Sequence, residues 1–103
     1  MPWIILLFAA LFEITWAIGL KYTEGLTRPV PTLLTVIALI LSIVLLAQAA
    51  RTLPIGTAYA VWTGVGTAGT VILGMVFMGD PVSAFRIGCV VLILAGVAGL
   101  RLA

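Results

Sequence analysis

The sequence predicts an all-α integral membrane protein with four transmembrane helices in a single domain, residues 1–103. Of these residues, 64% are hydrophobic and only 8% are charged, which leaves too few polar side chains to cover a soluble protein of this size. Four apolar runs of about twenty residues are each long enough to cross about 30 Å of hydrocarbon at 1.5 Å per residue. Short segments with glycine, proline or charge separate these runs. Such short connections predict an up-down helical bundle.

The apolar runs differ in how clearly they are bounded. We expect the spans at residues 2–20, 30–50, 55–78 and 82–100. The first follows Met1 without the basic segment that opens a signal peptide, and it is longer than a usual signal-peptide core, so we expect a retained helix. The second and third carry no charge. The fourth has Arg86 near its start and Arg101 at its end, and both side chains must extend to the membrane interfaces.

The distribution of Lys and Arg gives almost no preferred orientation. With four spans, Arg51 and Arg101 lie on one side of the membrane, and Lys21, Arg28 and Arg86 lie on the other. The positive-inside rule therefore has little asymmetry to act on. Two interpretations stay open: the rule is merely weak here, or the chain inserts in both orientations and an antiparallel dimer can form.

Composition also argues against several classes of function. A formal charge of +2, scattered along the chain, provides no basic patch for nucleic acid. One cysteine, Cys89, and the lack of histidine exclude an internal disulfide and argue against a His/Cys metal site in one chain. No constellation of nucleophile and base is evident, so an enzyme is the least favoured class. We expect no metal and no cofactor.

Glu13 lies near the middle of the first span. An acidic side chain at that depth costs roughly 2.5–3.5 kcal/mol on insertion scales, and no other Asp, Glu, Lys or Arg occupies the middle of a span. One interpretation is a protonated carboxyl that only hydrogen-bonds a neighbouring helix. The favoured interpretation is a group inside a cavity that binds a proton or a cation. Burial disfavours the charged form of a carboxyl, so it can hold a proton and exchange it for a cation.

Four polar or aromatic residues are candidates for the surroundings of Glu13. Trp16 lies three residues later on the same helix face, where its indole N–H can donate to a carboxylate and its ring can stack on a planar cation. Ser42 provides the hydroxyl in the middle of the second span, a weak signal by itself. Tyr59 and Trp62 also share a helix face. They fit either an interfacial belt or a cavity lining, and the depth of Trp62 favours the cavity.

Small residues gather in the third and fourth spans. Gly64 and Gly66 remove side chains from one segment, which allows either close helix packing or a kink. Ala95, Gly96 and Gly99 form a small-residue segment in the fourth span that is suited to helix association, although such spacings are frequent by chance in glycine-rich spans.

These features together resemble the small multidrug resistance family over essentially the whole chain, and within it the guanidinium exporter branch. Two segments carry the resemblance: residues 3–22, which begin with Trp3 and end in L-F-E-I-T-W-A-I-G-L-K-Y, and L-P-I-G-T-A-Y-A-V-W-T-G-V-G at 53–66. It implies a multi-pass, dual-topology, antiparallel homodimer in the bacterial inner membrane. It also implies a proton-coupled antiporter that uses alternating access to export guanidinium and small singly substituted guanidinium compounds.

The resemblance also implies roles for individual residues. Glu13 of each subunit would bind either protons or substrate. Trp16 and Ser42 would orient Glu13 by hydrogen bonds, while Tyr59 and Trp62 would line the pocket. Gly64 and Gly66 would let the third helix bend differently in the two subunits, and the fourth helices, with Ala95, Gly96 and Gly99, would hold the dimer together.

Three positions depart from the family pattern. Ala10 stands where a glycine is frequent, Thr67 replaces a commoner alanine, and Arg101 replaces a usual lysine. Because Ala10 and Thr67 border or approach the inferred pocket, we expect them to affect the substrate range. They remove none of the inferred ligands.

Other functions remain as alternatives. A broad exporter of quaternary ammonium and lipophilic cations would need a roomier pocket with fewer hydrogen bonds, and Trp16 and Ser42 argue against it. From a different class, a proton-carrying subunit of a rotary ring also uses a carboxylate in the middle of the membrane, but such subunits usually have two spans. A purely structural membrane subunit is the last alternative. Cross-linking separates a dimer from a large ring.

Overall fold

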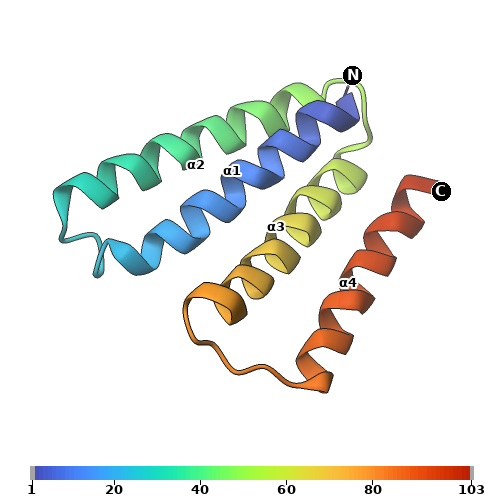
Figure 1. The fold of residues 1–103 in the computed structure, drawn as a ribbon. Helices are drawn as coiled ribbons and strands as arrows, with labels where there is room; N and C mark the ends of the chain where they lie inside the picture. Colours follow the sequence, from blue (N-terminus) through green and yellow to red (C-terminus); the bar gives the residue numbers. More distant parts are fainter. Residues whose placement is uncertain (1, 103) are drawn as a thin grey trace.

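A computed structural model describes residues 2–102, and in this range the chain is entirely helical apart from its connections (Figure 1). The helices are α1 (Pro2–Tyr22), α2 (Pro29–Ala49), α3 (Ile55–Phe77) and α4 (Ala84–Leu102). Each is long and apolar enough to cross a membrane. The predicted all-α membrane fold with four spans is therefore confirmed, with boundaries that shift by at most two residues.

Local hydrogen bonds explain the shifted boundaries. α1 runs two residues beyond the expected Leu20 and ends at a tight turn around Thr23, which is fully buried. The Thr23 hydroxyl donates to the Leu20 carbonyl at 2.7 Å and accepts from the Leu26 N–H at 3.2 Å. At the other end, α4 begins two residues late because the Ser83 hydroxyl accepts the Arg86 N–H at 3.1 Å and so caps the helix.

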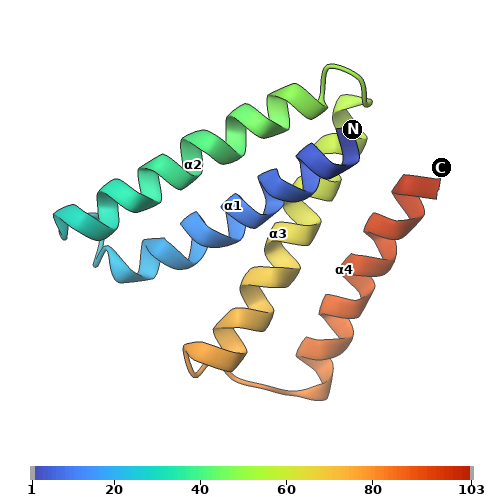
Figure 2. The ribbon, with the colours of Figure 1, turned by 45° about the horizontal axis from the view of Figure 1, so that its top comes forward.

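The four helices form an open arrangement and not a closed bundle. α1 and α2 lie side by side as an antiparallel pair, α3 packs beneath α1, and the backbone of α4 approaches only that of α3 within residues 2–102 (Figures 1 and 2). The Cα atoms span 41 × 34 × 16 Å, a flat shape. The expected up-down order of the helices is present, but α4 does not close against α2. As a result, Val90 is the one buried residue of α4.

The apolar core lies where α1, α2 and α3 converge near the N-terminal end of α1. Leu6, Ala49, Ala58 and Val61 form its buried cluster. Beside it, the Arg101 guanidinium lies 5.1 Å from the centroid of the Trp3 ring, a cation–π contact that links the end of α4 to the start of α1. This contact and the packing against α3 hold α4 in place.

Large apolar side chains cover the outside of all four helices. Leu34 on α2 is 62% exposed and Phe85 on α4 is 82% exposed. A soluble monomer rarely shows apolar patches of this extent, whereas a protein solvated by lipid exposes them as a rule. The surface therefore supports the membrane assignment independently of helix length.

A glycine allows α1 and α2 to pack closely. A Cβ atom at Gly19 would overlap the hydroxyl oxygen of Thr35, which is buried on α2. The small residue at this point sets the distance between the two helices.

We expect Gly19→Ala to lower the free energy of unfolding by about 1–3 kcal/mol, because the added methyl group overpacks the contact with Thr35. The measurement is reversible unfolding in mixed detergent micelles. Gly56→Ala is the matched control, since a Cβ there meets nothing within 4 Å. Equal stability of the two variants would contradict the proposed close contact, and Thr35→Ala should rescue Gly19→Ala in part.

Candidate cation-binding site

Glycine creates the space that Glu13 occupies. The Glu13 side chain projects from the middle of α1 onto α3, where a Cβ at Gly66 would overlap its carboxylate. One turn further along, Gly69 makes room in the same way for Ile14. Of the two interpretations of the α3 glycines, close helix packing is therefore what this structure shows for Gly66, and also for Gly64, which faces Val97 of α4. α3 is one continuous helix here, and its bending in a dimer stays a prediction.

A recess of about 160 Å³ lies at the Glu13 carboxylate, between α1 and α3. It is lined by Glu13, Ala17, Gly66, Thr67, Thr70 and Val71. Thr67 is thus one of the residues that line this recess. Ala10, which is fully buried, instead lines a neighbouring recess of about 210 Å³ that extends from Trp3 to Arg101.

Two buried polar atoms in the middle of α1 have no hydrogen-bond partner within residues 2–102. They are Glu13 Oε1, an acceptor, and Trp16 Nε1, a donor. A buried polar group without a partner is unfavourable by roughly 1–3 kcal/mol, and more when charged. The two side chains lie three residues apart on α1 and so share one helix face, and of the two only Glu13 lines the recess.

Ser42, Trp62 and Tyr59 are brought together one helical turn away from Glu13. The fully buried Ser42 hydroxyl donates to the Ala9 carbonyl at 2.7 Å and accepts from Trp62 Nε1 at 2.8 Å. The Tyr59 and Trp62 rings are tilted by 51°, with their centroids 5.7 Å apart. The structure thus joins three of the predicted residues in one network.

This network differs from the one that the family resemblance implied. In the structure Ser42 uses its hydrogen bonds on Ala9 and Trp62, and Trp16 Nε1 stays without a partner, so neither side chain orients Glu13 in a single chain. Ser42 does not contact Glu13 by a hydrogen bond because it lies beside Ala9, one helical turn before Glu13 on α1. Hydrogen bonding of Trp16 and Ser42 to Glu13 stays a prediction for the assembled protein.

The sequence interpretation missed Ala17, Thr70 and Val71. Ala17 is four residues after Glu13 and Thr70 is three residues after Thr67, so helical spacing could have found both. The Thr70 hydroxyl donates to the Gly66 carbonyl at 2.7 Å, at the same glycine that receives Glu13. Among residues 2–102, no cluster of His, Cys, Asp and Glu could hold a metal ion.

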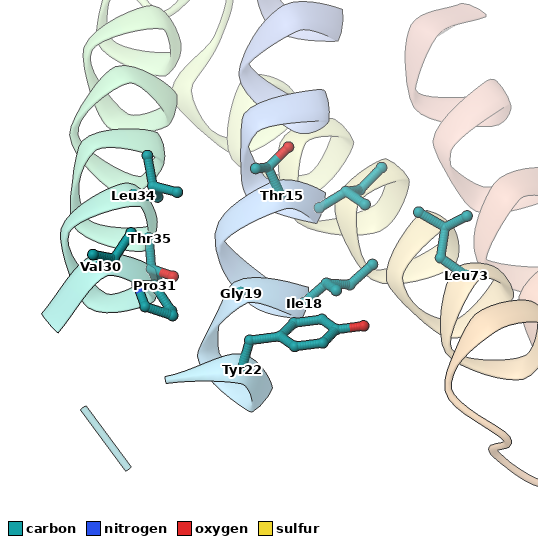
Figure 3. A pocket seen from close by; sticks show the side chains of 10 residues that line it. Thr15, Ile18, Gly19, Tyr22, Val30, Pro31, Leu34, Thr35 and Leu73 are labelled. Atoms are coloured by element: carbon teal, nitrogen blue, oxygen red, sulfur yellow. The ribbon is translucent and has the colours of Figure 1, made fainter. Parts of the chain in front are cut away.

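A larger cavity of about 500 Å³ lies elsewhere, on the side of α1 where Thr15 and Gly19 are located. Figure 3 shows Ile18 and Tyr22 projecting from α1 on the side of Leu73, while Leu34 and Thr35 line the cavity from α2. Its lining is almost entirely apolar and includes no ionisable group besides the Tyr22 phenol. By size alone this cavity would be the candidate binding site, but a cation needs a carboxylate, which favours the recess at Glu13.

Four helices that can span a membrane, with a carboxylate at a recess between two of them, define a multi-pass membrane protein with an ionisable group inside its helical bundle. The chain belongs to the small multidrug resistance family, since a model of that family, described as Small Multidrug Resistance protein, matches residues 1–93. Together with the four spans, this family places it in the bacterial inner membrane. The predicted family resemblance is confirmed.

Curated relatives resemble the chain over nearly its full length. It is 53% identical over 102 residues to a guanidinium exporter of Citrobacter freundii, covering 99% of this chain and 97% of the relative. It is 54% identical over 103 residues to a guanidinium exporter of Yersinia pseudotuberculosis, covering 100% and 99%. A guanidinium exporter of Escherichia coli is 50% identical over 102 residues, covering 99% and 97%. These relatives confirm the resemblance to the guanidinium exporter branch.

We expect Ser42→Ala to lower the free energy of unfolding by about 1–3 kcal/mol, because it leaves the buried Trp62 N–H without an acceptor. Unfolding measurements on Ser42→Ala, Trp62→Phe and the double variant give the coupling energy between the two side chains. Ser42→Ala should lower the free energy of unfolding by clearly less when Trp62 has already been replaced by phenylalanine. Strictly additive effects would contradict the hydrogen bond.

Proposed function

We propose that this protein exports guanidinium, and small singly substituted guanidinium compounds, in exchange for protons. The observation that carries the proposal is Glu13, a carboxylate without a partner beside a recess in the middle of the membrane. The guanidinium exporters that share 50–54% identity with nearly the whole chain support the same substrate. Their names and the family also favour a transporter over an enzyme.

The chemistry of the site suits a planar cation with N–H groups. Guanidinium stays charged at neutral pH and presents pairs of N–H donors that match the two oxygens of a carboxylate. Glu13 Oε1 is free to accept such donors, and the Trp16 ring provides a flat surface three residues away on the same helix. The small recess favours a compact ion over a bulky one.

Coupling follows from competition for one carboxylate site. Glu13 cannot hold a proton and a guanidinium ion together. When the site faces the outside, a proton binds and releases the cation. When the site faces the inside, a cation binds and releases the proton. An inward proton gradient then drives export when the site opens to each side in turn. Burial in the membrane helps, because it makes the protonated form of the carboxyl accessible.

We further propose that the working unit is an antiparallel homodimer. One chain supplies one Glu13, and its Oε1 and the Trp16 Nε1 lack partners within residues 2–102. α4 carries an open small-residue segment, since a Cβ at Gly96 or Gly99 would meet nothing within 4 Å. A second copy would supply the other carboxylate and cover this segment, which includes Ala95. The nearly even distribution of Lys and Arg between the two sides fits insertion in both orientations.

Glu13→Gln should abolish proton-driven concentration of guanidinium in proteoliposomes, because an amide cannot exchange a proton for a cation. The measurement is radiolabelled guanidinium accumulation against an imposed pH gradient. Glu13→Asp is the control, since it retains a carboxylate and should keep coupled transport at a reduced rate. Concentrative transport by Glu13→Gln at the level of the unmodified protein would overturn the proposal.

Competition between substrates distinguishes this function from broad multidrug export. Guanidinium and methylguanidinium should compete for transport at comparable concentrations, whereas tetraphenylphosphonium, which is bulky and has no N–H group, should compete at least tenfold less well. The assay measures inhibition of guanidinium uptake. Equal competition by tetraphenylphosphonium would instead favour a broad exporter of lipophilic cations.

A further inference from the structure

One face of α3 carries hydroxyl groups that the proposed mechanism does not use. Thr63, Thr67 and Thr70 follow one another at spacings of four and three residues, so they share one face of the helix. The neighbouring faces are used for packing, with Gly66 against α1 and Gly64 against α4. Two of the three hydroxyl-bearing residues, Thr67 and Thr70, line the recess that contains the Glu13 carboxylate.

The hydroxyl groups of this face differ in their hydrogen bonds. In a membrane helix a threonine usually donates to the carbonyl four residues earlier, because lipid offers no other acceptor. Thr70 does so with Gly66 at 2.7 Å, and Thr15 on α1 does so with Leu11 at 3.0 Å. Thr67 makes no such bond within residues 2–102, and the Thr63 hydroxyl is buried without any partner. Thr67 is exposed in the single chain and lines the same recess as Glu13, so its hydroxyl is accessible to a ligand there.

A free hydroxyl next to a cation-binding carboxylate can act in two complementary ways. Its oxygen can accept an N–H from the cation, and its hydrogen can meanwhile donate to the carboxylate. Both bonds involve a charged group, which makes them stronger than a bond between neutral groups. A cation without N–H groups can form only the weaker contact with the oxygen.

We propose that Thr67 is a ligand of the transported cation and selects ions that carry N–H groups. This inference rests on the proposed function at Glu13 and deepens it. It assigns to α3 a direct hydrogen bond to the substrate, in addition to the space that Gly66 provides. Thr70 supports the site without binding the ion in the same way, since its hydrogen is already used by the Gly66 carbonyl.

The test compares guanidinium dissociation constants of purified protein in detergent at one fixed pH. Thr67→Val keeps the side-chain volume but removes the hydroxyl, and it should weaken guanidinium binding about fivefold to tenfold. Thr67→Ser keeps the hydroxyl and should bind within about twofold of the unmodified protein. Thr15→Val makes the same exchange of hydroxyl for methyl outside the recess and should also bind within about twofold.

The possible outcomes separate this inference from the proposed function. If Thr67→Val binds guanidinium as well as the unmodified protein, or if Thr67→Ser loses as much affinity as Thr67→Val, the hydroxyl is not a ligand and the inference is wrong. If the unmodified protein itself fails to bind guanidinium, the proposed function is wrong and the inference falls with it. Should the valine variant not fold, Thr67→Ala against Thr67→Ser provides the same comparison of a side chain with and without the hydroxyl.

Discussion

The contact of the Glu13 carboxylate with the bare backbone of Gly66 is the feature on which the rest of the site depends. A membrane offers no water to satisfy a polar side chain, so the helices themselves must provide both the space and the partners. Gly66 provides the space, and Thr67 and Thr70 on the adjoining turn bring hydroxyl groups to the same recess. A larger residue at position 66 would both displace the Glu13 carboxylate and close the recess.

Glycine at other contacts of the fold acts in the same way. Gly19 brings α2 onto α1, Gly64 brings α4 onto α3, and Gly69 receives Ile14. Because van der Waals packing drives helix association in lipid, these points of close approach fix the geometry of the chain. The Ser42–Trp62 hydrogen bond then ties α2 to α3 at the level of Ala9 and sets the position of the Trp62 ring.

The sequence predicted the number, type and approximate limits of the helices because hydropathy reports directly on the length of a membrane span. It also drew attention to Glu13, because a lone carboxylate in an apolar run is energetically unfavourable in a membrane, and the structure has a recess at this side chain. It could not predict that the backbone of α4 would approach only that of α3, because an apolar helix surface suits lipid and protein equally. Nor could it predict that the Trp62 N–H would donate a hydrogen bond to Ser42, or that Ala10 and Thr67 would line different recesses. Those depend on how α1, α2 and α3 are rotated against one another, which hydropathy does not encode.

The open position of α4 has a consequence for the behaviour of the protein in the cell. With one buried residue, α4 contributes little to the stability of a single chain. Under the proposed assembly, a single chain also carries only one of the two carboxylates of the site. Folding, assembly and activity then depend together on how many copies share the same area of membrane. At low surface density, transport should rise more steeply than in proportion to the amount of protein. The cell would then control export through the level of expression as well as through the supply of substrate.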